Sequence, residues 1–230
     1  MATTYIPTTI LRQLDSQQPV SQRFRLQQPK PLNPPIEPLK EKFSVEGSLL
    51  MYVGNLERYQ GIDLLLESFA IALKEMPTAH LVVIGGAPDD VYAYRLKAEN
   101  MRLNNRVHFI GPRPIEQLNQ YLEQADVVVS PRIQGNNTPM KLYSYLDSGK
   151  ALLATNLTTH TQVLNEHIAC IAEPTAPSFA EGMVQLIANP LLRQKLGLAA
   201  QRYIAREHTY EAFSQKLTGL YDWLQQDLVA

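Results

Sequence analysis

The chain has 230 residues, of which 45% are hydrophobic, so it can form one generous domain or two small ones around a packed core. Its 21 Lys and Arg residues nearly balance 22 Asp and Glu residues, and the isoelectric point is near 6.5, which argues against an overall attraction to nucleic acid or anionic lipid. The single cysteine, Cys170, argues against a disulfide framework, and no apolar run approaches the roughly 20 residues that span a bilayer, so we expect a cytoplasmic protein without a transmembrane segment.

Residues 1–44 differ in composition from the rest of the chain. The stretch QQPVSQRFRLQQPKPLNPPIEPLKEKF is rich in Gln and Pro and shows no sustained helical or strand period. Closely spaced prolines remove backbone donors and bias the preceding residues towards extended geometry. We therefore predict a poorly ordered tail or linker over residues 1–44 and a folded domain over residues 45–230.

From residue 49 onward, short apolar runs alternate with longer segments of helical period. These runs are nearly all apolar rather than alternating, as expected for parallel strands that are covered on both faces. They are LLMYV (49–53), LVVIG (81–85), VHFIG (107–111), VVVS (127–130), ALLAT (151–155) and IACIA (168–172). The pattern predicts an α/β fold with a single Rossmann-like, doubly wound parallel sheet of about six strands. Helices should cover both of its faces, and further helices should follow near 190–206 and 209–226.

The loops after the predicted strands are the places to look for a ligand, because ligands of such sheets lie beyond the carboxyl ends of the strands. Four of these loops contain glycine, proline or polar residues: Gly54–Asn55, Gly85–Gly86, Gly111–Arg113 and Ser130–Asn137. Each loop alone is also compatible with ordinary turn chemistry. Together they favour a ligand cleft.

The stretch GNNTPMKLYSYLDSG, Gly135–Gly149, suggests an anion site. Thr138 suits the N-cap of a helix over residues 139–148, and Pro139 suits its first position, where the missing N–H costs nothing. Lys141 in the first turn opposes the helix dipole, and a bound phosphate would explain its presence. A capped helix with a solvated lysine remains the alternative.

Six segments of the chain resemble a known family. They are MYVGNLERYQGIDLLLESFA, HLVVIGG, RVHFIGPRP, LNQYLEQADVVVSPR, TPMKLYSYLDSGKALLATN and LIANPLLRQKLGLAAQRYI. In this order they are similar to the C-terminal, nucleotide-sugar-binding domain of family 4 retaining glycosyltransferases of the GT-B fold, and the resemblance covers roughly residues 46–226.

The resemblance implies a donor site between two Rossmann-like domains. It places the base near Gly111, Pro112 and Arg113 and the ribose at the position of Ser144. It requires no metal and no cofactor, since the substrate is a nucleotide diphosphate sugar, and it identifies no catalytic residue here. We expect the diphosphate to lie against Gly54, Asn55, Arg58, Arg132, Asn136, Asn137, Thr138, Pro139 and Lys141.

Two pairs of charged residues that are common in the family are replaced by neutral ones. Two glutamates eight positions apart, one facing the sugar and one the ribose, correspond to Asn136 and Ser144. A serine offers one short neutral hydroxyl where a carboxylate accepts two ribose hydroxyls, so ribose binding should be weaker or rerouted. An arginine and a lysine that reach the diphosphate correspond to Asn55 and Gln60.

Other cations could compensate for the missing arginine and lysine. The candidates are Arg58, Arg113, Arg132 and Lys141, of which Arg132 and Lys141 lie in the loop and helix after the fourth strand. Either one could instead be a solvated surface charge. The five histidines show no spacing typical of metal ligands.

Enzymes of this type also have an N-terminal domain that holds the acceptor, and this chain offers about 45 Pro-rich residues in its place. Our hypothesis is a donor-binding domain of a retaining hexosyltransferase that binds a nucleotide sugar and needs a separate acceptor-binding polypeptide for activity. The alternative is a catalytically degenerate domain that acts as an assembly or regulatory partner, for instance through self-association. An oxidoreductase is a weaker hypothesis, because VVIGGAPDD lacks the GxGxxG fingerprint.

Overall fold

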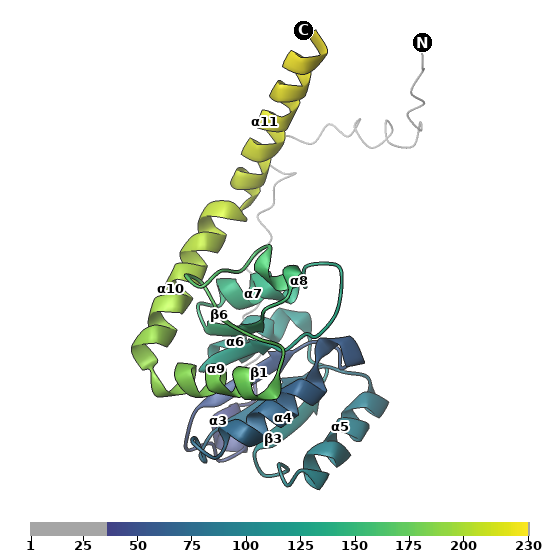
Figure 1. Ribbon diagram of the computed structural model, residues 1–230, viewed down its shortest axis with the longest axis vertical. Helices are drawn as coiled ribbons and strands as arrows, with labels where there is room; N and C mark the ends of the chain where they lie inside the picture. Colours follow the sequence, from purple (N-terminus) through teal and green to yellow (C-terminus); the bar gives the residue numbers. More distant parts are fainter. Residues whose placement is uncertain (1–35, 230) are drawn as a thin grey trace, which may run out of the picture. The chain divides into compact units, whose positions relative to one another are not determined.

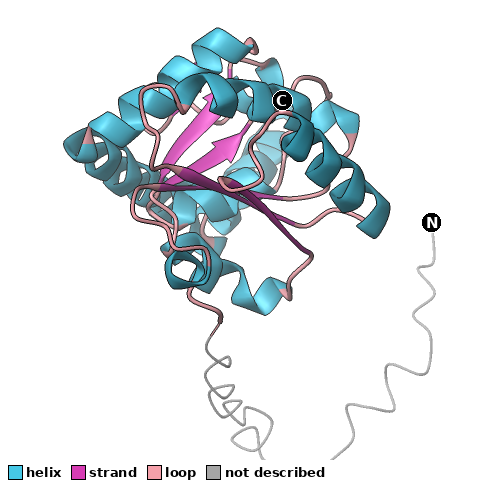
Figure 2. Cartoon of the chain, turned by 90° about the horizontal axis from the view of Figure 1, so that it is seen from below, coloured by secondary structure: helices cyan, strands magenta, loops and turns pink. Residues whose placement is uncertain are grey.

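The computed structural model describes residues 36–229, which form one parallel sheet of six strands in the order β3-β2-β1-β4-β5-β6 (Figures 1 and 2). The predicted tail up to residue 35 lies outside the described residues. The strands are β1 Leu49–Val53, β2 His80–Ile84, β3 Val107–Gly111, β4 Val127–Ser130, β5 Ala151–Thr155 and β6 Cys170–Ala172. Four of the six match the predicted ranges residue for residue, β2 begins one residue early, and β6 is two residues shorter.

Helices cover both faces of the sheet, as Figure 2 shows. On one face, Leu50 and Tyr52 of β1 pack in a core with α4, α5 and α9. On the other face, Leu49 and Met51 pack with α3, α6 and α7. The helices are α3 Leu39–Lys42, α4 Ile62–Ala72, α5 Pro88–Asn100, α6 Leu118–Glu123, α7 Lys141–Asp147, α8 Thr158–Thr161, α9 Ala176–Ala188, α10 Pro190–Glu207 and α11 Tyr210–Val229, with 3-10 turns η1 Arg58–Gln60 and η2 Ile115–Gln117. The expected doubly wound α/β fold is confirmed.

The strand order reverses between β1 and β4. β2 and β3 follow β1 towards one edge of the sheet, whereas β5 and β6 follow β4 towards the other, although β1 and β4 are themselves parallel neighbours. The chains that leave these two strands therefore run in opposite directions. A reversal of this kind leaves a crevice at the carboxyl ends of the two strands, where ligands of doubly wound sheets bind.

The folded unit begins at Ile36 rather than at the predicted residue 45. Leu39 of α3 is fully buried, and its backbone N–H donates to Gln124 Oε1 at 2.7 Å. Lys40 pairs with Asp126 at 2.9 Å. A single buried leucine in a four-residue helix produces no periodic pattern, so composition alone assigned this segment to the tail.

None of the helices in residues 36–229 is long and apolar enough to cross a membrane.

The end of α7 is held by a close approach to α10. Gly149 follows α7, and a methyl group added to Gly197 of α10 would lie 1.9 Å from the Gly149 carbonyl oxygen. No L-residue with a side chain can occupy this position without moving one of the two helices. The glycine at 197 thus sets how closely α10 packs against α7.

We expect Gly197→Ala to lower the free energy of unfolding by about 1–3 kcal/mol, because the new methyl group overlaps a backbone atom. Gly219→Ala in α11 is the control, since a methyl group there meets no atom within 4 Å. That change should raise stability by about 0.5–1 kcal/mol through helix propensity alone. Urea denaturation followed by circular dichroism measures both variants, and equal effects would contradict the close contact.

Candidate functional site

The candidate site lies at the carboxyl ends of β1 and β4, where the strand order reverses. Lys141, the first residue of α7, extends from the β4 side to the β1 side. Its Nζ donates to Gln60 Oε1 at 2.9 Å and lies 4.0 Å from the centroid of the Tyr52 ring. A β-carbon on Gly54 would come within 3.2 Å of the same nitrogen. The ammonium group therefore sits against the loop that follows β1.

Two tyrosines hold these parts together. The Tyr52 hydroxyl donates to the Asn55 carbonyl at 2.6 Å, which shapes the loop after β1. Tyr145 of α7 accepts from the Val53 N–H at 2.7 Å and donates to the Val53 carbonyl at 3.1 Å. Neither residue was predicted to belong to the site, because Tyr52 lies in the apolar run LLMYV and Tyr145 lies inside a predicted helix. The hydroxyl at the end of each buried ring was the available signal, since such groups need polar partners.

Lys141 is a partly buried cation whose hydrogen-bond partner is a neutral amide oxygen. Burial, together with the nearby charge of Arg132, lowers the pKa of its ammonium group from 10.5 to about 7. A bound anion would oppose both effects, because it favours the protonated form. The arrangement is thus electrostatically incomplete in a way that a phosphate would satisfy.

Arg132 is used to shape its own loop. The side chain is 5% exposed, and it donates to the carbonyls of Gln134 at 2.6 Å and Asn137 at 2.8 Å. A third bond reaches the Asn137 side chain at 3.1 Å, and the guanidinium lies 5.1 Å from the Tyr59 ring centroid. Gly135 crosses the guanidinium so closely that a β-carbon there would lie 2.1 Å from Nη2. Three of the five N–H donors are therefore engaged within residues 132–137.

The start of α7 differs from the prediction. The helix spans Lys141–Asp147 rather than residues 139–148, and it has no side-chain cap. The N-cap residue is Met140 and not Thr138, whose hydroxyl accepts a hydrogen bond from the Gln162 amide. The first turn is instead closed by bonds of three-residue spacing, from the N–H groups of Leu142 and Tyr143 to the carbonyls of Pro139 and Met140 at 3.0 and 3.2 Å.

The other residues predicted to bind the diphosphate lie in the same two loops. Asn55 is exposed, and its amide donates to the Tyr59 hydroxyl at 3.3 Å. Arg58 begins η1 and is exposed, as is Asn136. The structure thus brings Gly54 and Lys141 into direct proximity, whereas diphosphate binding by the remaining residues stays a prediction.

Ser144, at the predicted ribose position, is partly buried on α7. It borders a hollow of about 780 Å³ between α7 and the junction of α10 and α11. Polar side chains in that hollow include Asp147, His208 and Lys216. The ribose role of Ser144 stays a prediction.

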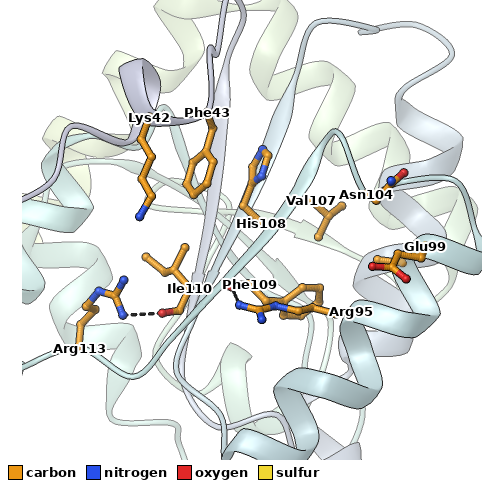
Figure 3. Close-up of a pocket in the computed structure, with 11 residues that line it drawn as sticks. Lys42, Phe43, Arg95, Glu99, Asn104, Val107, His108, Phe109, Ile110 and Arg113 are labelled. Carbon is orange, nitrogen blue, oxygen red and sulfur yellow. Dashed lines mark hydrogen bonds between the residues drawn. The ribbon is translucent and has the colours of Figure 1, made fainter.

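The predicted base-binding loop, Gly111–Arg113, follows the edge strand β3. Figure 3 shows Arg113 at one end of a hollow of about 440 Å³ that runs along β3. Its guanidinium donates to the Ile110 carbonyl at 2.5 Å, to the Tyr121 hydroxyl at 3.1 Å and to Glu37 at 2.8 Å. The Arg113 side chain therefore ties the segment before α3 to the end of β3, and base binding by this loop stays a prediction.

No group of three or more His, Cys, Asp or Glu side chains within residues 36–229 is arranged to hold a metal ion.

The chain is similar in sequence to known glycosyltransferases. The sequence matches the family described as "Glycosyl transferases group 1" over residues 36–203. It is 25% identical over 179 residues to D-inositol 3-phosphate glycosyltransferase of Corynebacterium diphtheriae, covering 75% of this chain and 42% of that protein. It is 21% identical over 184 residues to phosphatidyl-myo-inositol mannosyltransferase of Mycobacterium tuberculosis, covering 77% and 47%. The chain thus spans less than half the length of these two relatives.

Solved structures share the fold. The structure of Anabaena HepE in complex with UDP matches with a TM-score of 0.70 at 17% identity, covering 80% of this chain and 51% of that chain. The C-terminal domain of a group 1 glycosyl transferase family protein from Francisella tularensis matches with a TM-score of 0.65 at 18% identity, covering 74% and 91%. The second comparison matches nearly the whole of a separate C-terminal domain.

The low pKa of Lys141 makes stability depend on pH. Between pH 7 and 10.5 the unfolded chain binds a proton on Lys141 that the folded chain lacks, so the folded state gains stability as the pH rises. Relative to Lys141→Met, we expect the free energy of unfolding to rise by up to about 1.4 kcal/mol per pH unit in this range. Urea denaturation of both proteins at pH 7, 8 and 9 measures the effect. A difference between them that stays constant with pH would contradict it.

Proposed function

The chain belongs to the group 1 glycosyl transferases, and on this basis we propose that it is the donor-binding half of a retaining hexosyltransferase. It binds a nucleotide diphosphate sugar at the carboxyl ends of β1 and β4. Transfer of the hexose, with retention of its anomeric configuration, requires an acceptor-binding domain to close over the donor. In this reaction the chain holds the diphosphate and stabilises it as the leaving group.

The position of Lys141 is the observation that carries this proposal. In the family that this sequence resembles, the residue corresponding to Gln60 is commonly a lysine that reaches the diphosphate. The Lys141 ammonium lies 2.9 Å from the Gln60 side-chain oxygen, so a cation from α7 occupies the region that the missing lysine would reach. A preorganised cation in a partly desolvated site stabilises the charge that develops on a departing diphosphate.

The choice of UDP as the first ligand to test comes from the structural neighbours. HepE, which shares the fold over 80% of this chain, was solved in complex with UDP. The loops that select the nucleobase substitute freely within one fold, so GDP and ADP derivatives belong in the same experiment.

The surface of α11 supports the need for a second polypeptide. Large apolar residues recur at spacings of three and four and remain exposed in the described part of the chain: Tyr210, Phe213, Leu217, Leu220 and Leu224. Contiguous apolar surface of this kind marks a protein interface. We assign this stripe to the contact with the acceptor-binding half.

A catalytically degenerate domain is the second candidate function. The engagement of the Arg113 and Arg132 side chains with the protein itself favours it, since fewer cations are then available to the diphosphate. This candidate predicts no affinity for nucleotide sugars.

We expect the wild-type chain to bind UDP or a UDP-, GDP- or ADP-sugar in isothermal titration calorimetry at millimolar ligand. Lys141→Gln should weaken binding about tenfold or more, because a charge-assisted bond to phosphate is lost. The exchanged variant Gln60→Lys with Lys141→Gln should recover most of the affinity, since the ammonium then reaches the same region from the other side.

Lys150→Gln is the matched control for this series. Lys150 lies just beyond the opposite end of α7, and its Nζ donates to the Glu123 carbonyl at 2.7 Å. Its replacement should leave nucleotide affinity unchanged. Absence of binding to all of these nucleotides by the wild type would refute the proposal and favour the degenerate domain.

We also expect the isolated chain to self-associate weakly through the α11 stripe when no acceptor-binding half is present. Phe213→Lys with Leu220→Lys should make it monomeric in sedimentation velocity at micromolar concentration, because lysines oppose burial of the stripe. Leu191→Lys on α10 is the control, since Leu191 is also exposed, at 77%. Equal sedimentation of all three proteins would remove the stripe as an interface.

A further inference from the structure

The segment from Thr155, the last residue of β5, to Gln162 bonds to the loop that precedes α7 near both of its ends. That loop, residues 131–138, connects β4 to the turn that presents Lys141. The segment includes α8, which is labelled in Figure 1. None of its residues belongs to the predicted diphosphate, ribose or base sites, so the proposed donor binding leaves it without a role.

His160 of α8 holds the end of β4, directly before the loop, from inside the protein. The imidazole is fully buried, and burial lowers its pKa to about 4, so it is neutral at physiological pH. Its Nδ1 lies 2.9 Å from the Thr155 carbonyl, which accepts from the ring N–H, and its Nε2 lies 3.0 Å from the Ser130 hydroxyl, which then acts as the donor. The Thr155 hydroxyl donates to the Arg132 carbonyl at 2.5 Å. Arg132 of the loop is thus fixed to β5, and Ser130, the residue of β4 directly before the loop, is fixed to α8.

Gln162 holds the other end of the loop from the surface. Its side-chain amide donates to the Thr138 hydroxyl, directly before Pro139. The Pro139 carbonyl accepts the N–H of Leu142 and so belongs to the turn that carries Lys141. A shift of Thr138 would therefore displace the base of the Lys141 side chain.

We propose that His160 and Gln162 are positioning residues, which hold residues 131–138 in the shape that places the Lys141 ammonium against Gln60. They touch neither the diphosphate nor the sugar. The loop interior is shaped by Arg132, whose hydrogen bonds lie within residues 132–137. The Ile133 N–H also donates to the Tyr59 carbonyl at 3.0 Å, which ties the middle of the loop to the segment after β1. The contacts from residues 155–162 hold its two ends. The link to donor binding rests on the proposed function, whereas the placement of Lys141 does not.

Gln162 is the residue to change, because replacing the fully buried His160 threatens the fold itself. Gln162 is exposed, and so is its neighbour Thr161, whose hydroxyl donates to the Leu157 carbonyl of the same segment. Thr161→Ala is therefore a matched control that removes a hydrogen bond without touching the loop.

The first measurement needs no nucleotide. The pH titration of the Lys141 side chain, followed by NMR of the labelled Cε, reports how desolvated the ammonium is and how close the positive charge of Arg132 lies. We expect the Lys141 pKa to be near 7 in the wild type and in Thr161→Ala. In Gln162→Ala it should rise by about one unit, because the ammonium gains solvent. An unchanged titration in Gln162→Ala would overturn the proposal, whatever the protein binds.

The second measurement compares UDP with uridine. Gln162→Ala should weaken UDP binding about threefold to tenfold, as loss of one hydrogen bond implies, and leave uridine binding unchanged. A general loss of structure would weaken the binding of both UDP and uridine. If UDP binds and Gln162→Ala behaves like Thr161→Ala, the link to donor binding fails. If the titration shifts but the wild type binds no nucleotide, the positioning role stands and the proposed function fails.

A double-mutant cycle separates the Gln162–Thr138 contact from indirect effects. Thr138→Val keeps the shape of the side chain and removes the acceptor oxygen. The cycle is read on the Lys141 titration, because Thr138 is itself a predicted diphosphate contact. We expect Thr138→Val and Gln162→Ala to raise the Lys141 pKa by similar amounts, and the double variant to raise it no more than either single one. Additive shifts would show that the two side chains act independently and would contradict the proposal.

Discussion

The reversal of strand order between β1 and β4 is the constraint on which the rest of the site depends. Because the chains leaving these neighbouring strands run in opposite directions, a crevice opens between them, and side chains from one loop can cross to the other. Lys141 makes that crossing and ends on Gln60. Tyr145, one turn further along α7, bonds both backbone groups of Val53 and so holds α7 against the end of β1.

Of the four candidate cations, Arg58 is exposed, and the other three divide into two kinds. The guanidinium groups of Arg113 and Arg132 present several donors in a planar fork, which suits them to backbone carbonyls, and both are used in that way. Lys141 carries a compact charge on a flexible stem, and its partner is a single neutral oxygen. Lys141 is therefore a partly buried cation paired with one neutral oxygen, and burial, together with the charge of Arg132, lowers its pKa to about 7.

Much of the fold could be predicted, and the limits of prediction have physical causes. The strands were found because fully buried parallel strands leave continuous apolar runs, whatever surrounds them. The segment before β1 was missed because Leu39 is buried by distant partners, with Gln124 bonding its backbone, and no local period records that. The start of α7 was misplaced because Thr138 is a residue type favoured at caps, yet the helix begins after Met140, and the Thr138 hydroxyl bonds to Gln162, 24 residues away.

The sequence by itself determined the order of elements, the family and the two loops in which the candidate site lies, since hydrophobic runs and strand-end residues are local features of the chain. Only the tertiary structure decided which of the candidate cations is available. Arg132 looks as suitable as Lys141 in the sequence, and the two differ in the carbonyls that folding brings within hydrogen-bond distance of the guanidinium. Hydrogen bonding to groups remote in sequence is set by packing, so the identity of the cation left for a ligand follows from the fold and not from the motif.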